Sequence, residues 1–218
     1  MLNSVLVCFA VPEEARFFTV PNPLQKSVEV LKTGIGCKNA VQSVERSLDR
    51  ASPSLVLTCG FAGGLRPGLQ VGSILFSSEA DGRLERILVE LGALPGRFHC
   101  SPKIVVTATE KSALWKNTGA DAVEMESESI CQVCHQRKIP SVTVRVISDS
   151  AEEDLPLDFN ALMTPDEKID YRKLAWSAFR SPKKIPALLR FQRQTRNAAR
   201  KLGQKLEELL RCRRALGG

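Results

Sequence analysis

Several carboxylates in this chain occur where a folded core does not need them. Asp149 follows the apolar run 141–147 after one serine, and Glu124 and Glu126 flank Met125 after a short apolar stretch. A carboxylate at the carboxyl end of a buried strand lies where α/β proteins place their chemistry. Helix capping and turn formation are the alternatives for each acid taken singly. A further acid in a similar context, Glu14 near the N-terminus, favours a chemical role for the set.

The elements that would position these acids follow from apolar patterning. Short apolar runs predict strands at 5–10, 28–31, 54–59, 72–76, 103–109 and 141–147. Helical spacing predicts helices that start at Pro12 and at Glu124, and others at 39–48, 81–91 and 110–115. Strands that alternate with helices across glycine-marked turns indicate a single α/β domain over residues 1–218 with a parallel or mixed sheet. The acidic, proline-containing stretch 151–170 reads as a long functional loop.

Composition narrows the class of protein. A chain of 218 residues with 43% hydrophobic content can bury one full core. No apolar run reaches membrane-spanning length, and the N-terminus lacks the basic start of a signal peptide, so we expect a cytoplasmic protein. Seven cysteines, an odd number, indicate small buried hydrophobes rather than disulfides.

Cofactor motifs are weak in this sequence. Cys131-Gln-Val-Cys134-His135 matches a haem-attachment pattern, but it falls in a helical segment of a chain without an export signal. The only histidines are His99 and His135, which argues against a metal centre and against a Ser-His-Asp triad. We therefore expect neither metal nor cofactor.

Two glycine clusters follow predicted strands. Gly34-Ile-Gly36 lies where a dinucleotide fingerprint would, but its third glycine is replaced by Asn39. The segment 60–65, Gly-Phe-Ala-Gly-Gly-Leu, is more distinctive, because glycines after a buried strand let backbone amides approach a ligand. A tight turn is the alternative.

Positive charge is concentrated at the C-terminus. The chain carries a net charge of +7, and residues 171–218 contain 14 Lys and Arg against two Glu. This region includes an amphipathic helix at 185–210 with basic residues around its apolar stripe. Three interpretations stay open: a core-facing helix with a solvated face, a helix on an anionic membrane surface, and nucleic-acid binding, which no stacking-aromatic motif supports.

Four ordered motifs together resemble the purine and uridine phosphorylase and nucleosidase superfamily over residues 4–155. They are Ala10-Val-Pro-Glu-Glu14, Thr33-Gly-Ile-Gly36, residues 60–65 with 71–74, and residues 122–126 with 144–149. The methylthioadenosine/S-adenosylhomocysteine nucleosidase branch is the most similar in style. Residues 105–111 and 185–190 resemble the hopanoid-associated subgroup, which acts on adenosylhopane. The resemblance implies a three-layer α/β/α fold with a central mixed, partly barrel-like sheet.

The resemblance also implies roles in cleaving the N-glycosidic bond of an adenine nucleoside. Asp149 would be the general acid for the departing base and would have to hold a proton near neutral pH, which burial favours. Glu14 would align or deprotonate the attacking water, and Glu126 would hold the ribose hydroxyls with Met125 on the ribose face. The remaining expected substrate-binding or supporting residues are Glu124, Ser148, Phe61, Gly60 and Gly34.

Departures from the family pattern leave alternatives open. Phe61 stands where the nucleosidases usually have Ser, and no counterpart of the paired phosphate-binding arginines is evident. Both facts favour hydrolysis, with phosphorolysis as the alternative and a catalytically inactive ligand- or membrane-binding member as the second. The short segment 77–103 leaves the substrate open. The resemblance further implies a homodimer or higher homo-oligomer.

Overall fold

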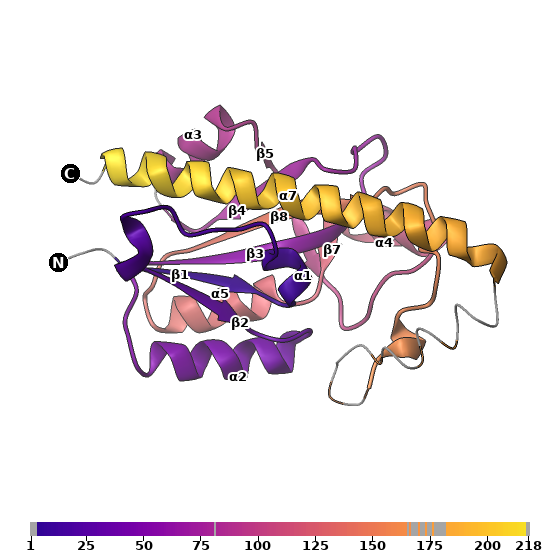
Figure 1. The fold of residues 1–218 in the computed structure, drawn as a ribbon, viewed down its shortest axis with the longest axis horizontal. Helices are drawn as coiled ribbons and strands as arrows, with labels where there is room; N and C mark the ends of the chain where they lie inside the picture. The colour runs from indigo at the N-terminus through magenta and orange to yellow at the C-terminus, as the bar shows by residue number, and fades with distance from the viewer. Residues whose placement is uncertain are drawn as a thin grey trace.

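A mixed sheet of eight strands forms the centre of the molecule, with helices on both of its faces (Figure 1). The computed structural model describes residues 4–80, 82–164, 166, 170, 173, 176 and 182–216. Its strands are β1 Val5–Phe9, β2 Val28–Lys32, β3 Leu55–Gly64, β4 Ile74–Ser78, β5 Leu94–Pro95, β6 Phe98–Cys100, β7 Ala122–Glu124 and β8 Ser141–Asp149. Its α-helices are α1 Pro12–Ala15, α2 Cys37–Leu48, α3 Gly82–Glu90, α4 Ala108–Thr118, α5 Ser127–Gln136 and α7 Ile185–Leu216.

The strand order explains why the acids converge. The main path is β2-β1-β3-β8-β4-β5, in which β1, β2, β3 and β8 run parallel. Their carboxyl ends therefore meet at one edge, which carries the residues after Phe9, the glycine end of β3 and Asp149. Strand β7 joins the same region by pairing antiparallel with Gly63 and Gly64. The predicted α/β fold with a mixed sheet is confirmed.

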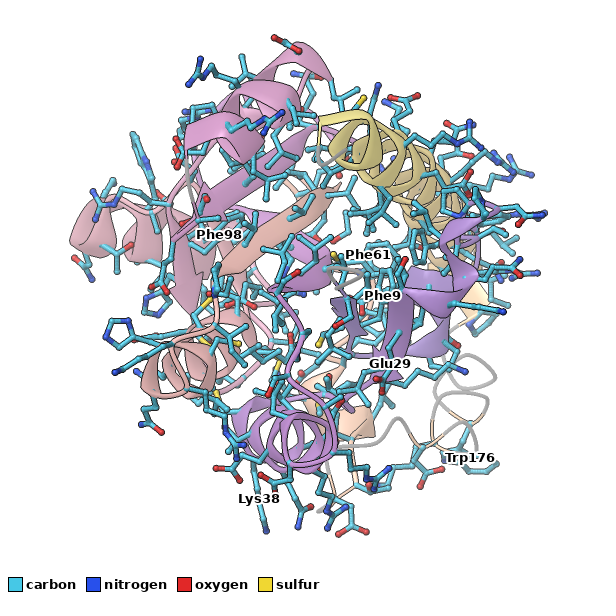
Figure 2. The ribbon with its side chains drawn as sticks, turned by 90° about the vertical axis from the view of Figure 1, so that its left-hand side faces the viewer. Phe9, Glu29, Lys38, Phe61, Phe98 and Trp176 are labelled. Atoms are coloured by element: carbon cyan, nitrogen blue, oxygen red, sulfur yellow. The ribbon has the colours of Figure 1, made fainter. Side chains whose placement is uncertain are left out.

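Alternate side chains of β1 enter two separate cores. Leu6 and Cys8 face α2 and α5, whereas Val7 and Phe9 face α3 and α7. This two-sided burial explains why the central strands read as continuous apolar runs. Figure 1 shows α7 crossing one face of the sheet with α2 and α5 beneath the other. Phe61 is partly buried and packs against the same core as Phe9, and both are labelled in Figure 2.

The second half of α7 belongs to the core. Buried positions recur on one face of this half, and Gly203 lies against the Phe17 carbonyl so closely that a Cβ would clash with it. The interpretation of 185–210 as a helix packed on the domain holds for this half. The buried residues are Ala198, Ala199, Leu202, Leu206, Leu209 and Leu210. None of the described helices is long and apolar enough to cross a membrane.

Several predicted boundaries differ from those of the structure. Residues 103–109 do not form a strand, because a capping box between Thr107 and Glu110 starts α4 there. Strand β3 continues to Gly64, past the predicted strand end at residue 59. The helix predicted from Glu124 begins at Ser127, after the short strand β7.

Candidate active site

A cavity of about 630 Å³ lies at the carboxyl edge of the sheet. Its size is typical of small-molecule sites. Polar lining includes Glu14, Glu124, Glu126, Ser148 and Asp149, with Met125 beside them. Apolar lining comes from Val11, Ile35, Phe61, Ile104, Val105, Leu155, Phe159, Leu188, Leu189 and Phe191. The structure thus brings together seven of the nine expected site residues on this lining.

Glu14 is held at the start of the short helix α1. Its Oε2 accepts hydrogen bonds from the backbone amides of Ala10 at 2.8 Å and Val11 at 3.2 Å, and its Oε1 accepts from the Phe61 amide at 2.8 Å. Burial raises the pKa of Glu14, while the positive charge of Arg145 and the three amides act in the opposite direction. Glu14 also connects the ends of β1 and β3.

A buried arginine pairs with the carboxylates of the cavity. Arg145 Nη2 lies 2.6 Å from Glu124 Oε2 and 3.5 Å from Glu126 Oε2, and it donates to Thr58 Oγ1 at 3.3 Å. Burial alone would lower the pKa of Arg145, but the negative charges of Glu124, Glu126 and Glu14 outweigh that effect and raise it. Arg145 is therefore a permanent cation that lets three carboxylates share one small volume.

Glu124 and Glu126 have different partners. The second Glu124 contact is with the backbone, since its Oε2 accepts from the amides of Glu126 at 3.0 Å and Ser127 at 2.7 Å. Glu126 Oε1 accepts from the Gly36 amide at 2.9 Å. Burial raises the pKa of Glu126 to about 7; Arg145 opposes this shift and neighbouring carboxylates add to it. Glu126 is thus a carboxylate of the cavity whose protonation state changes near neutral pH.

The two remaining expected residues, Gly60 and Gly34, are not on the lining. Gly60 lies behind it, where a Cβ would collide with the Glu14 carboxylate and an Arg145 nitrogen. Gly34 has a φ of 87°, a left-handed conformation that favours glycine, and turns the chain towards the Gly36 amide that binds Glu126. Both glycines shape the site from outside the cavity.

Asp149 ends β8 with both carboxylate oxygens engaged. Oδ1 accepts from Ser148 Oγ at 2.6 Å, and Oδ2 pairs with Lys111 Nζ at 2.6 Å. The expected acid thus faces the cavity with an ammonium group behind it.

The apolar wall is assembled from segments distant in sequence. Phe159, just before the 3₁₀ turn Asn160–Leu162, packs against Phe191 of α7 with ring centroids 5.7 Å apart. The Asn160 side chain bonds both the amide and the carbonyl of Ile104, at 2.9 and 2.8 Å. The predicted loop 151–170 therefore contributes wall residues through its described part.

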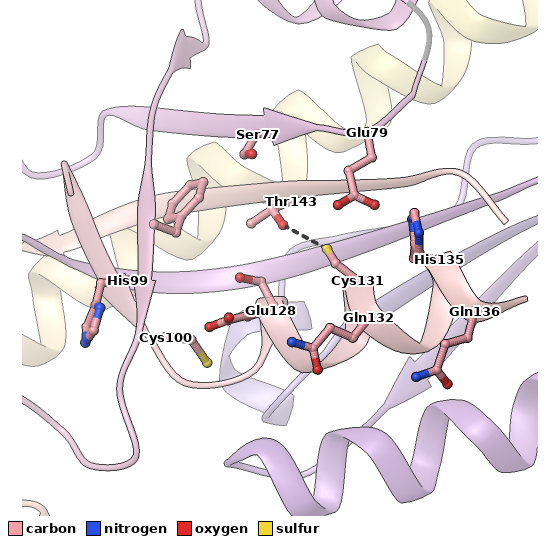
Figure 3. Close-up of a pocket in the computed structure, with 12 residues that line it drawn as sticks. Ser77, Glu79, His99, Cys100, Glu128, Cys131, Gln132, His135, Gln136 and Thr143 are labelled. Carbon is pink, nitrogen blue, oxygen red and sulfur yellow. Dashed lines mark hydrogen bonds between the residues drawn. The ribbon is translucent and has the colours of Figure 1, made fainter. Parts of the chain in front are cut away.

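A second hollow of about 590 Å³ lies between β6, α5 and the end of β4 (Figure 3). Its lining includes His99, Cys131 and His135, with Cys131 Sγ 3.8 Å from Thr143 Oγ1. Within the described part of the chain, no group of three or more His, Cys, Asp or Glu side chains could hold a metal ion. This hollow does not contain the converging carboxylates.

Two cations of the site, Arg145 and Lys111, were not expected from the sequence. Arg145 interrupts the apolar run 141–147, and a charge within a buried strand is a signal for a buried partner. Lys111 had no comparable signal, because it lies in a polar stretch that resembles any solvated helix.

Comparison with known proteins decides the family. The model of the phosphorylase superfamily matches residues 8–90 and 83–167. The chain belongs to this superfamily. Within it, a 5'-methylthioadenosine/S-adenosylhomocysteine nucleosidase of Anoxybacillus flavithermus is 30% identical over 171 residues, which cover 63% of this chain and 74% of that protein.

Two solved structures share the fold. Futalosine hydrolase of Helicobacter pylori superposes with a TM-score of 0.70 at 17% identity, covering 97% of this chain and 98% of that one. The methylthioadenosine/S-adenosylhomocysteine nucleosidase of Neisseria meningitidis, in complex with methylthio-immucillin-A, superposes with a TM-score of 0.69 at 20% identity, covering 97% of this chain and 100% of that one. These likenesses support the three-layer arrangement.

Proposed function

We propose that this protein hydrolyses the N-glycosidic bond of an adenine nucleoside. The observation that carries the proposal is the convergence of Glu14, Glu126 and Asp149 on one cavity at the carboxyl edge of a superfamily fold. Similar proteins named as nucleosidases and as a hydrolase support the reaction class. Ser148 and Asp149 match the Ser-Asp pair of the adenine-specific branches, which supports adenine as the base.

Each carboxylate has a distinct task in this proposal. Glycosidic cleavage develops positive charge on the ribose and negative charge on the departing base. Glu126 accepts hydrogen bonds from the ribose hydroxyls and stabilises the sugar cation, while Met125 packs on the ribose face. Glu14 orients the attacking water and accepts its proton, and Asp149 protonates the base.

Water as the nucleophile is supported by the charges of the cavity. Arg145 is already paired with Glu124, and Lys103 is the only Lys or Arg among the described lining residues. Lys103 lies 3.9 Å from Glu110, and 68% of its side chain is exposed. Phosphate would need a denser set of cations.

The apolar wall supports a substrate with a bulky apolar 5′ substituent, such as adenosylhopane. Leu188, Leu189 and Phe191 come from α7, opposite the strand ends that carry the acids. A hydrocarbon placed against them would leave water at a gain of roughly 25 cal/mol per Å². Phe61 in place of Ser adds to this apolar surface.

Adenine release measured with and without phosphate tests the reaction. Equal rates in both buffers are expected; strict dependence on phosphate would establish phosphorolysis. A series of 5′-substituted adenosines of growing apolar length should show rising kcat/KM. Release from none of them would leave the alternative of an inactive ligand-binding member.

We also propose contact with an anionic membrane surface through the start of α7. Ile185 and Leu189 are 40% and 52% exposed, next to Lys183, Lys184 and Arg190. Exposed apolar residues surrounded by basic residues are typical of helices that bind anionic lipid surfaces. Co-sedimentation with phosphatidylglycerol vesicles should weaken in Ile185→Asp, which lies outside the cavity lining, whereas unchanged binding would contradict the contact.

We also propose, from the family resemblance, that the protein is a cytoplasmic homo-oligomer. Light scattering after gel filtration should give the mass of a dimer, and the mass of a monomer would contradict the proposal.

A further inference from the structure

Lys111 is a charged side chain buried completely beside the proposed acid. Its side chain has 0% exposure, and its Nζ lies 2.6 Å from Asp149 Oδ2. The same nitrogen donates to the carbonyls of Ser150 at 2.7 Å and Glu153 at 2.8 Å. An ammonium has three protons to donate, and three acceptors meet this one.

Such burial needs an explanation, because removing an ammonium from water is unfavourable unless it is paired and hydrogen-bonded. Other acids nearby are committed elsewhere: Glu110 accepts from Thr107, Glu152 from the Gly68 amide and Asp154 from the Ala108 amide. Asp149 is the only carboxylate within 4 Å of Lys111 Nζ among the described residues.

Asp149 is correspondingly restrained. Ser148 Oγ holds Oδ1 and Lys111 holds Oδ2, so the carboxylate plane is fixed by one contact on each oxygen. An adjacent ammonium stabilises a carboxylate in its charged form. In an ion pair of this geometry the protons lie on the ammonium, so a proton for the leaving base can reach it from Lys111 through Asp149.

We propose that Lys111 is the positioning residue and proton source of Asp149, and this rests on the proposed nucleosidase function. As the glycosidic C–N bond breaks, its electron pair passes to the base. The Lys111 ammonium passes a proton to Asp149 Oδ2, and Asp149 passes a proton on to the base, which restores the carboxylate. Lys111 is left neutral and regains a proton from solvent through Asp149 after the base departs, so no other reactant is needed.

A double-mutant cycle on an adenine nucleoside tests the coupling. Lys111→Met should lower kcat/KM by about 10²- to 10³-fold, within the range for general-acid catalysis. The double variant Lys111→Met/Asp149→Asn should equal Asp149→Asn alone, because Lys111 acts through Asp149. Losses that multiply would overturn the proposal.

A substrate whose leaving group departs without general-acid assistance distinguishes a role in proton supply from structural damage. With p-nitrophenyl ribofuranoside, Lys111→Met should stay within about threefold of wild type, since general acid assistance is lost only for the base. An equal loss on both substrates contradicts the role in proton supply.

Lys111→Arg serves as a second variant if the Met variant does not fold. Arg retains the charge but does not give up its proton, so it should be impaired on the nucleoside. Wild-type turnover by this variant would exclude proton transfer from Lys111. A wild-type enzyme that releases no adenine refutes the proposed function itself, whereas an active enzyme with an unaffected Lys111→Met refutes this inference alone.

Discussion

Arg145 and Glu124 form an ion pair of 2.6 Å in which each side chain is 1% exposed. The pair links β8 to the end of β7, so it joins the strand that carries Asp149 to the segment that carries Met125 and Glu126. The same guanidinium charge also opposes the rise that burial causes in the pKa of Glu14. One cation therefore supports three acids of the site, Glu14, Glu124 and Glu126.

Loss of this cation should destabilise the whole protein. Arg145→Met leaves Glu124 buried without a counter-charge, and we expect about 3–5 kcal/mol of lost unfolding free energy by urea denaturation. Arg137→Met is the matched control, because its 2.6 Å pair with Asp49 is exposed and should contribute less than about 1 kcal/mol. Similar losses in both variants would contradict the structural role of Arg145.

Asp149→Asn should abolish adenine release while the fold persists. The amide can occupy the same place but cannot relay a proton, so we expect kcat to fall by about 10²- to 10⁴-fold. Circular dichroism and thermal unfolding check the fold, and Asp158→Asn, at an exposed position, should remain fully active. Retained turnover by Asp149→Asn would exclude it as the acid.

Glu126 should make stability depend on pH. Its pKa rises from 4.5 to about 7 on folding, so its favourable contribution is complete below pH 4.5 and is lost as pH rises through 7. At 1.36 kcal/mol per pKa unit, the loss is on the order of 3 kcal/mol. Urea unfolding at pH 5 and pH 8 should show this difference in wild type and a smaller one in Glu126→Gln; identical pH dependence would be evidence against it.

Replacement of Phe191 should raise the KM of long apolar substrates selectively. Phe191→Ala removes one wall ring and its contact with Phe159, so KM should rise about tenfold for a long 5′ hydrocarbon, equal to about 1.4 kcal/mol. For methylthioadenosine we expect little change. Val89→Ala, an exposed position outside the cavity lining, is the control. A uniform KM increase across the series would refute the apolar subsite.

The acids of the site were predictable because strand ends are visible in sequence. The apolar run before Asp149 marks a buried strand, and parallel strands bring their carboxyl ends together. Glu124 also follows an apolar stretch, but it reaches the site through the antiparallel pairing of β7 with β3. The supporting cations were not predictable in the same way. Whether Lys111 faces solvent or a carboxylate depends on the contact between α4 and β8, which no local pattern contains.

Errors in the predicted fold have local physical causes. The Val-rich stretch 103–109 has high strand propensity, but Thr107 and Glu110 form the capping box that starts α4, and that pattern was present in the sequence. Strands β5 and β6 have two and three residues, too few to show a period. Tertiary pairing with β4 and β7 creates them.

Helix α7 divides its length between two tasks. Positions 188–195 line the cavity, and positions 198–210 complete the core. Deletion of the helix would therefore unfold the domain and could not reveal what its basic face binds. Exchange of the first turns alone is the better experiment, since substrate range can then be transplanted between relatives without disturbing the segment on which folding depends.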